Sequence, residues 1–179
     1  RLGRIVDDLL ILARADSGER PPTLVRLFLD DVVADAAGAA GALALSRGVA
    51  VELGAFDEAP VLGDAELLRQ LVMILLDNGI KFTPSGGTVT VSVARETERT
   101  VLAVADTGPG IAPEQLPHVF ERFYRGDPAR GRGDLGAGSA GGAGLGLSIA
   151  HWMPTAHGAT ITVASTVRHG TAASVGFPL

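Results

Sequence analysis

The spacing of apolar side chains predicts four helices. Residues 1–17 carry an apolar stripe at intervals of three and four, and a lone amphipathic helix of that length needs a partner to be stable in water. An Ala-rich helix is expected from about Asp30 to Ser46, and a short helix over Leu145–Met153. The strongest helix is expected over Asp64–Lys81, where apolar residues surround most of the circumference, so we expect it to be buried.

Alternating and short continuous apolar runs predict the strands. Two antiparallel hairpins are expected, one over Thr88–Ala94 and Thr100–Ala105, the other over Ala159–Ala164 and Ala172–Phe177. Shorter strands are expected over Leu24–Phe28, Val49–Leu53 and Pro60–Leu62. Helices mixed with antiparallel hairpins indicate an α+β fold in which helices cover one face of a sheet. The helix breakers Gly18, Pro21 and Pro22 mark the one boundary in the pattern.

The composition adds three constraints. The 179 residues carry a net charge of −5, which argues against a nucleic-acid surface, and the absence of Cys excludes a disulfide scaffold, Cys-ligated zinc and thiol catalysis. Apolar runs are too short to span a bilayer, so no part of the chain is expected in a membrane. Eight of the 24 glycines lie in residues 125–144 with a single leucine, and this segment is expected to be mobile because it has too little apolar surface to fold alone.

Two polar side chains interrupt the apolar stripe of the strongest helix. At about 100° per residue, Asn78 and Lys81 fall on the face that also carries Leu67, Leu71 and Ile74. Burying an amide or an ammonium without a partner costs a few kcal/mol, so each is expected to face a ligand, an ion or a satisfied neighbour. The alternative, that both residues merely cap the last helical turn, is about equally consistent with the spacing.

The run Asp106-Thr107-Gly108-Pro109-Gly110-Ile111 follows directly on a predicted strand. Alternation places Asp106 on the face of Leu102 and Val104, so a carboxylate stands at the rim of an apolar surface, where it can accept a hydrogen bond from an exocyclic amine. The glycines allow the backbone to approach a flat ring. Taken alone, an Asp-initiated turn without any ligand explains the run better.

A third run, Gly142-Ala143-Gly144-Leu145-Gly146-Leu147, precedes the short helix. Glycines at a helix start leave first-turn amides free to face an anion, but the run alone is weak evidence and lacks the context of a dinucleotide fingerprint or a P-loop. Phe120 and Phe123 lie three residues apart, and they either pin one end of the Gly-rich segment or are ordinary core aromatics. Arg125 is either solvated or an anion partner.

The order of these runs resembles the catalytic ATP-binding domain of sensor histidine kinases. The helix end Asp77-Asn78-Gly79-Ile80-Lys81-Phe82-Thr83-Pro84, the D-T-G-P-G-I run, F-E-R-F-Y-R and G-x-G-L-G-L match its N box, first glycine box, F box and second glycine box, in family order. The resemblance assigns residues 23–179 to that domain. Residues 1–20 are similar to the end of the family's dimerisation and phosphotransfer helix hairpin, which would explain the lone apolar stripe.

The resemblance implies a two-layer α/β sandwich of the Bergerat ATP-binding type, a mixed sheet with helices on one face, preceded by one N-terminal helix. Its implied cofactors are ATP and Mg²⁺. Asn78 would give its side-chain oxygen to Mg²⁺, while Lys81 and Arg125 would offset phosphate charge. Asp106 would accept from the adenine amino group, and Thr171 would touch adenine through water. The other implied nucleotide contacts are Phe82, Gly108, Gly110, Ile111, Gly142, Gly144, Leu145, Gly146 and Leu147.

The activity that the resemblance implies is that of an ATP-dependent protein histidine kinase, in which positioning and charge neutralisation supply most of the catalysis. The γ-phosphoryl group of Mg-ATP would pass to a His on the dimerisation domain and then to the receiver domain of a response regulator. The full-length protein would be a homodimeric signal-transduction phosphoprotein. This chain would be the cytoplasmic domain of a membrane-anchored sensor, with no nucleic-acid or membrane contact of its own.

The histidines depart from the family pattern. The phosphoacceptor His, which an acidic residue follows in the family, has no counterpart among His118, His151, His157 and His169. The chain could therefore bind ATP but could not phosphorylate itself. Each of the four is interpreted as a surface or packed histidine.

Two further departures motivate an alternative function. Ile74 stands where the family usually has a second Asn, and Pro154 should kink or end the last helix by removing a hydrogen bond to Ala150. They favour a degenerate kinase-like module that acts by dimerisation or partner docking, with weak or no nucleotide binding. An ATPase of the gyrase or mismatch-repair branch is a third interpretation, less favoured because only Gln70 or Asp77 could stand in for its acidic general base.

Overall fold

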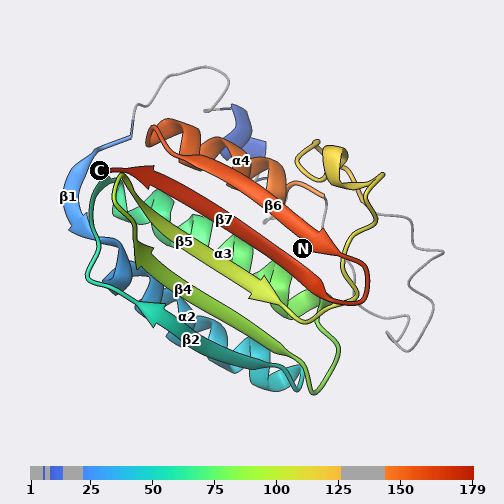
Figure 1. Ribbon diagram of the computed structural model, residues 1–179. Helices are drawn as coiled ribbons and strands as arrows, with labels where there is room; N and C mark the ends of the chain where they lie inside the picture. The colour runs from blue at the N-terminus through green and yellow to red at the C-terminus, as the bar shows by residue number, and fades with distance from the viewer. Residues whose placement is uncertain (1–5, 7–8, 14–21, 126–143) are drawn as a thin grey trace.

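A five-stranded mixed sheet forms one layer of the molecule in the computed structural model, which describes residue 6 and residues 9–13, 22–125 and 144–179. The strand order is β2 (Ala50–Phe56), β4 (Thr88–Arg95), β5 (Arg99–Asp106), β7 (Gly170–Pro178) and β6 (Thr160–Thr166). Only the β2–β4 pair is parallel; the other three pairs are antiparallel. The α+β fold with helices on one sheet face is thereby confirmed (Figure 1).

Three helices form the second layer and lie side by side behind the sheet in Figure 1. They are α2 (Leu29–Ser46), α3 (Ala65–Phe82) and α4 (Gly146–Ala156), with α3 between the other two. A separate two-stranded antiparallel sheet pairs β1 (Val25–Phe28) with β3 (Pro60–Gly63), and a 3₁₀ turn, η1, spans Leu116–His118. No helix within these described ranges is long and apolar enough to cross a membrane.

The core lies between the sheet and α3. The strands place alternate apolar side chains on the side that faces the helix, and α3 turns a wide apolar face toward them. Val89, Val91 and Val93 of β4 are fully buried on the helix-facing side, as is Leu102 of β5. The buried positions of α3 are Leu68, Leu71, Val72, Leu75, Leu76, Gly79 and Ile80. Each of the large side chains contributes roughly 1.5–3 kcal/mol by leaving water. The α3 helix is therefore held rigidly against the strands that end at the candidate site.

The beginning of α3 is fixed by an unusual set of hydrogen bonds. Asp64 is its N-cap, with Oδ1 accepting from the backbone N–H groups of Glu66 and Leu67 and Oδ2 accepting from the N–H of Thr23 at 3.0 Å. The backbone N–H of Asp64 in turn donates to Nε2 of His157, which is buried at the end of α4. Nδ1 of His157 bonds to the Met153 carbonyl at 2.7 Å. A neutral His157 thus joins the start of α3 to the end of α4, which makes it a packed histidine as expected.

The last helix differs from its sequence prediction at its C-terminal end. The expected stop at Met153 is wrong, because α4 continues through Pro154 to Ala156. Proline removes only its own N–H, and its carbonyl still accepts from the backbone N–H groups of His157 and Ala159 at 2.8 and 2.9 Å. Within residues 22–125 and 144–179, the other predicted helices and strands are confirmed to within a few residues at their ends.

The N-terminal helix is described only in part. Residue 6 and residues 9–13 are helical, while Gly18 and Pro21 of the predicted boundary lie outside the described residues. Leu12 is 4% exposed and joins the core of the domain, whereas Val6, Leu9 and Leu10 are exposed. Part of the predicted stripe therefore packs against the domain itself, and part faces outward.

We expect the His157→Leu substitution to lower the free energy of unfolding by about 2–4 kcal/mol, because it leaves a backbone donor at Asp64 and a carbonyl at Met153 without partners. The matched control is His151→Leu, an exposed histidine of the same helix, which should change stability by less than about 0.5 kcal/mol. Urea unfolding followed by circular dichroism measures both. Equal losses in the two variants would contradict the bridging role of His157.

Candidate functional site

The C-terminal half of α3 faces the first turn of α4 across a glycine. A Cβ atom at Gly146 would lie 3.5 Å from Cγ2 of Ile74 and 3.9 Å from Nδ2 of Asn78, so the two helices approach with little between them. Nδ2 of Asn78 is buried and has no hydrogen-bond partner among the described residues. The first amides of a helix have no acceptor within it, so the start of α4 adds further free donors here. An acceptor-rich ligand, such as a phosphate chain, would satisfy these groups.

Positive charge gathers beside this contact. Lys81 is half-buried in the last turn of α3, and burial lowers the pKa of its ammonium group below the ordinary value. Arg125 and Arg47 are near enough to lower that pKa further, whereas Asp77 raises it. No carboxylate of the described residues lies within salt-bridge distance of Lys81. A half-buried cation of this kind, crowded by two others, favours the arrival of an anion.

Asp106 ends β5 on the helix-facing side of the sheet, as the alternation predicts. Its Oδ1 accepts hydrogen bonds from the backbone N–H groups of Gly108 at 2.8 Å and Thr171 at 3.2 Å. Burial raises the pKa of the Asp106 carboxyl above its ordinary value, and these two hydrogen bonds oppose the rise. A Cβ atom at Gly79 would lie 3.8 Å from Cβ of Asp106, which shows how closely α3 approaches the end of this strand. The structure therefore brings Asp106 and the Asn78 end of α3 together.

The turn after Asp106 is hydrogen-bonded to the end of β6 and to the turn between β6 and β7. The backbone N–H of Arg168 donates to the Pro109 carbonyl at 2.7 Å, and that of Ile111 donates to Oγ of Ser165 at 2.8 Å. Gly110 has φ +72°, and a Cβ atom there would collide with the Thr166 carbonyl. The glycine runs predicted to shape a base pocket thus also serve the close packing of two backbone turns.

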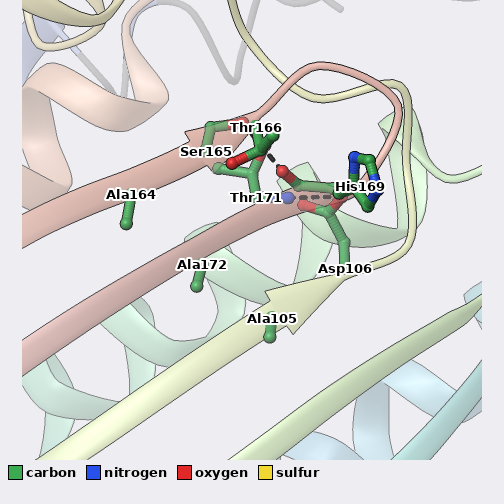
Figure 2. A pocket seen from close by; sticks show the side chains of 9 residues that line it. Ala105, Asp106, Ala164, Ser165, Thr166, His169, Thr171 and Ala172 are labelled. Atoms are coloured by element: carbon green, nitrogen blue, oxygen red, sulfur yellow. Dashed lines mark hydrogen bonds between the residues drawn. The ribbon is translucent and has the colours of Figure 1, made fainter.

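The ends of β5, β7 and β6 surround a hollow of about 240 Å³. Figure 2 shows Asp106 and Thr171 together at its edge, with Ser165 beside them. Strand register places Ala105, Ala172 and Ala164 in one row across the sheet. Because side chains alternate along a strand, this row lies on the face away from the helices, whereas Asp106, Thr171 and Ser165 lie on the helix-facing side. The hollow therefore opens on the outer face of the sheet, behind the strand ends that carry the polar group.

The F box is tied to the second glycine box through the backbone. The N–H of Phe123 donates to the Gly144 carbonyl at 2.9 Å, and a Cβ atom at Gly144, whose φ is +75°, would lie 2.8 Å from the carbonyl carbon of Phe123. The Phe123 ring itself is 59% exposed, so its interpretation as a core aromatic is wrong. Phe120 is half-buried, and its ring centroid lies 4.8 Å from that of His151 on α4. The residues before and after the Gly-rich segment therefore meet at one point.

The remaining predicted site residues lie as follows. The Phe82 ring is 44% exposed, with the Lys81 ammonium 4.8 Å from its centroid. Leu145 is the N-cap of α4 and its side chain is buried in the core, while Leu147 is half-buried. Gly142 and the expected mobility of the Gly-rich segment lie outside the described residues.

Sequence reasoning missed Ser165. The predicted closing hairpin stopped at Ala164 and Ala172, whereas the observed ladder continues with Ser165 opposite Thr171 and Thr166 opposite Gly170. Extending the alternation by one pair would have placed the Ser165 and Thr171 hydroxyl groups next to each other.

Comparison with known proteins identifies the family to which this geometry corresponds. Residues 63–179 match the model of the histidine kinase-, DNA gyrase B- and HSP90-like ATPases. The chain is 38% identical over 168 residues to the sensor histidine kinase CusS of Escherichia coli O6:H1, covering 94% of this chain and 34% of that protein. It is 36% identical over 178 residues to the sensor-like histidine kinase SenX3 of Mycobacterium tuberculosis H37Rv, covering 99% and 42%. The chain thus spans well under half the length of these relatives.

Solved structures show the same fold. Full-length ShkA in complex with AMPPNP superposes with a TM-score of 0.83 at 26% identity, covering 99% of this chain and 35% of that one. The mycobacterial sensor histidine kinase MprB superposes with a TM-score of 0.71 at 27% identity, covering 88% and 100%.

Because the pKa of Asp106 is raised, we expect the contribution of this residue to the stability of the folded protein to depend on pH. Because the folded state holds this proton more tightly than the unfolded state, the stability that the protonated carboxyl contributes is lost as pH rises through the folded pKa. Asp106→Asn keeps an oxygen for both backbone donors, so its stability relative to the unsubstituted chain should increase between about pH 4 and pH 7. Asp35→Asn, an exposed control on α2, should show no such trend. Thermal unfolding across this pH range measures both, and parallel curves would contradict the burial cost.

Proposed function

Because this chain belongs to the histidine kinase-, DNA gyrase B- and HSP90-like ATPases, as the catalytic ATP-binding domain of a sensor histidine kinase, we propose that it binds Mg-ATP between α3 and α4. It would then donate the γ-phosphoryl group to a His on a dimerisation domain, for relay to a response-regulator receiver domain. The observation that carries this proposal is the buried side-chain nitrogen of Asn78, which has no hydrogen-bond partner among the described residues and faces the first turn of α4 across Gly146.

The Asn78 side chain suits Mg²⁺. Its side-chain oxygen is a hard ligand atom. Its side-chain nitrogen has no hydrogen-bond partner among the described residues, so a phosphate oxygen could accept a hydrogen bond from it. Among the described residues no group of three or more His, Asp or Glu side chains could hold a metal, so phosphates and waters would complete the coordination shell, as Mg²⁺ commonly requires. When bound, the ion would neutralise charge on the β- and γ-phosphates.

The other site residues would divide the nucleotide between them. Lys81 and Arg125 would attract the phosphates, and the first amides of α4 after Gly144 would bond to them. Asp106 would accept from the adenine amino group, with Thr171 beside it. The solved structure of full-length ShkA is a complex with AMPPNP, an ATP analogue, which supports nucleotide binding by this chain.

The N-terminal residues would link this domain to a dimer. We assign residues 1–20 to the end of a dimerisation helix hairpin and residues 23–179 to the catalytic domain. The exposed apolar side chains of Val6, Leu9 and Leu10 support a partner helix, because such a stripe is unstable in water when uncovered. The full-length protein would be a homodimeric, membrane-anchored sensor with this domain in the cytoplasm.

A degenerate module without nucleotide is the second candidate. Ile74 supports it, because its methyl group, not a polar amide, lies against the start of α4. Pro154 supports it less than the sequence suggested, since α4 keeps its first turns and continues past the proline.

We expect Asn78→Ala to remove the Mg²⁺-dependent part of ATP affinity. Calorimetric titration of the unsubstituted chain should show ATP binding at least about tenfold tighter with Mg²⁺ than without it, and the variant should bind equally in both conditions to within about twofold. The substitution removes a buried side-chain nitrogen that has no hydrogen-bond partner among the described residues, so it should not destabilise the fold. Asp35→Ala, at an exposed position of α2, serves as the control and should bind like the unsubstituted chain.

Two outcomes of this titration would count against the proposal. An Asn78→Ala variant that kept its Mg²⁺ dependence would contradict the metal assignment. No detectable binding by the unsubstituted chain at millimolar nucleotide would favour the degenerate module.

Phosphoryl transfer predicts a product of defined chemistry. With ATP labelled at the γ-phosphate, this domain should label a separately supplied dimerisation domain on His, giving a bond that is lost in acid and stable in base. Lys81→Ala should slow labelling about tenfold or more by removing a phosphate-facing charge. Label on Ser or Thr, which survives acid, would contradict the histidine kinase assignment.

A further inference from the structure

We infer that Ser165 is a positioning residue that fixes the hydroxyl proton of Thr171, so that the base-binding edge presents only hydrogen-bond acceptors and selects a 6-amino purine. This inference rests on the proposed function. Ser165 lies near the end of β6, directly opposite Thr171 of β7. Neither the sequence motifs nor the roles proposed above give it a task.

Three polar contacts surround the Ser165 hydroxyl. It donates to the Gly170 carbonyl at 2.8 Å and lies 2.9 Å from Oγ1 of Thr171, its neighbour in Figure 2. It also accepts from the backbone N–H of Ile111 at 2.8 Å. It therefore contacts the turn after Asp106 and the first two residues of β7, one of which belongs to the proposed base site.

Counting hydrogens decides the direction of the third contact. A serine hydroxyl has one hydrogen and two lone pairs. The Gly170 carbonyl can only accept, so it takes the single hydrogen of Ser165, and the Ile111 N–H can only donate, so it takes one lone pair. The remaining lone pair must accept from Thr171, whose own hydroxyl hydrogen is thereby directed at Ser165.

The consequence is an edge made of acceptors. Thr171 Oγ1 is left with lone pairs only. Oδ1 of Asp106 already accepts from two backbone N–H groups, which leaves Oδ2 as a free acceptor among the described residues. An exocyclic amine carries two N–H donors and complements such an edge, directly or through one water. A carbonyl at the same purine position would oppose lone pairs to lone pairs, which selects against 6-oxo purines.

Without the Ser165 hydroxyl, the Thr171 hydroxyl would be free to rotate and to donate. The Thr171 hydroxyl could then donate a hydrogen bond to the carbonyl of a 6-oxo purine, whereas in the unsubstituted chain its hydrogen is directed at Ser165. A role of Ser165 in packing alone would weaken both kinds of purine together, so the ratio of their affinities separates positioning from general structural support.

The test compares ADP with inosine diphosphate, which carries a carbonyl where ADP carries the amine, by calorimetric titration in Mg²⁺. Ser165→Ala should weaken ADP binding about three- to tenfold while inosine diphosphate binding is unchanged or tighter, so the affinity ratio falls. Ser165→Thr retains the hydroxyl and should restore the ratio of the unsubstituted chain.

A second variant covers the case in which Ser165→Ala does not fold. Thr171→Val removes the oriented hydroxyl directly and should lower the ratio similarly, and adding Ser165→Ala to it should lower the ratio no further. Equal weakening of both nucleotides, or a ratio unchanged in Thr171→Val, would overturn the inference. If the unsubstituted chain does not bind ADP at all, the proposed function is overturned as well. If it binds ADP but the variants leave the ratio of ADP to inosine diphosphate affinity unchanged, only the role of Ser165 is overturned.

Discussion

The half-buried carboxylate of Asp106 is the group on which the candidate site depends. One of its oxygens accepts from the turn that follows it, through Gly108, and from the last strand, through Thr171, so a single side chain holds three segments in register. Burial makes its charge costly. The fold bears this cost where α3 approaches the end of β5 over Gly79, and a hydrogen-bond acceptor of fixed direction results.

The two ends of the site are prepared in different ways. At the proposed base end the Ser165 hydroxyl uses its hydrogen and both lone pairs, and two turns are bonded backbone to backbone. At the proposed phosphate end the Asn78 side-chain nitrogen has no hydrogen-bond partner among the described residues, and Lys81 is crowded by other cations. Rigidity at one end lowers the entropy lost on binding. At the other end, polar and charged groups without partners gain favourable interactions when a charged ligand binds.

Periodicity was sufficient to predict most of the architecture, since α3 and the two hairpins owe their positions to apolar spacing alone. The family followed from the order of four short motifs, none of which is persuasive singly. Geometry that depends on proton direction or on backbone approach is not visible in the sequence pattern. Ser165 falls just outside the predicted strand, and Gly110 is expected only to shape a pocket, whereas it also allows two backbone turns to approach each other. Pro154 misled because a proline disturbs the turn before it and leaves the turn after it intact.

The hydrogen bond between Thr171 and Asp106 joins residues 65 positions apart in the sequence. Contacts of such separation form late in folding, because a long loop must close before they are rewarded. The proposed base site therefore does not exist in any partly synthesised chain that ends before β7. Nucleotide can stabilise only the finished domain, so during translation the chain must fold through its last strand unaided before ATP can add to its stability.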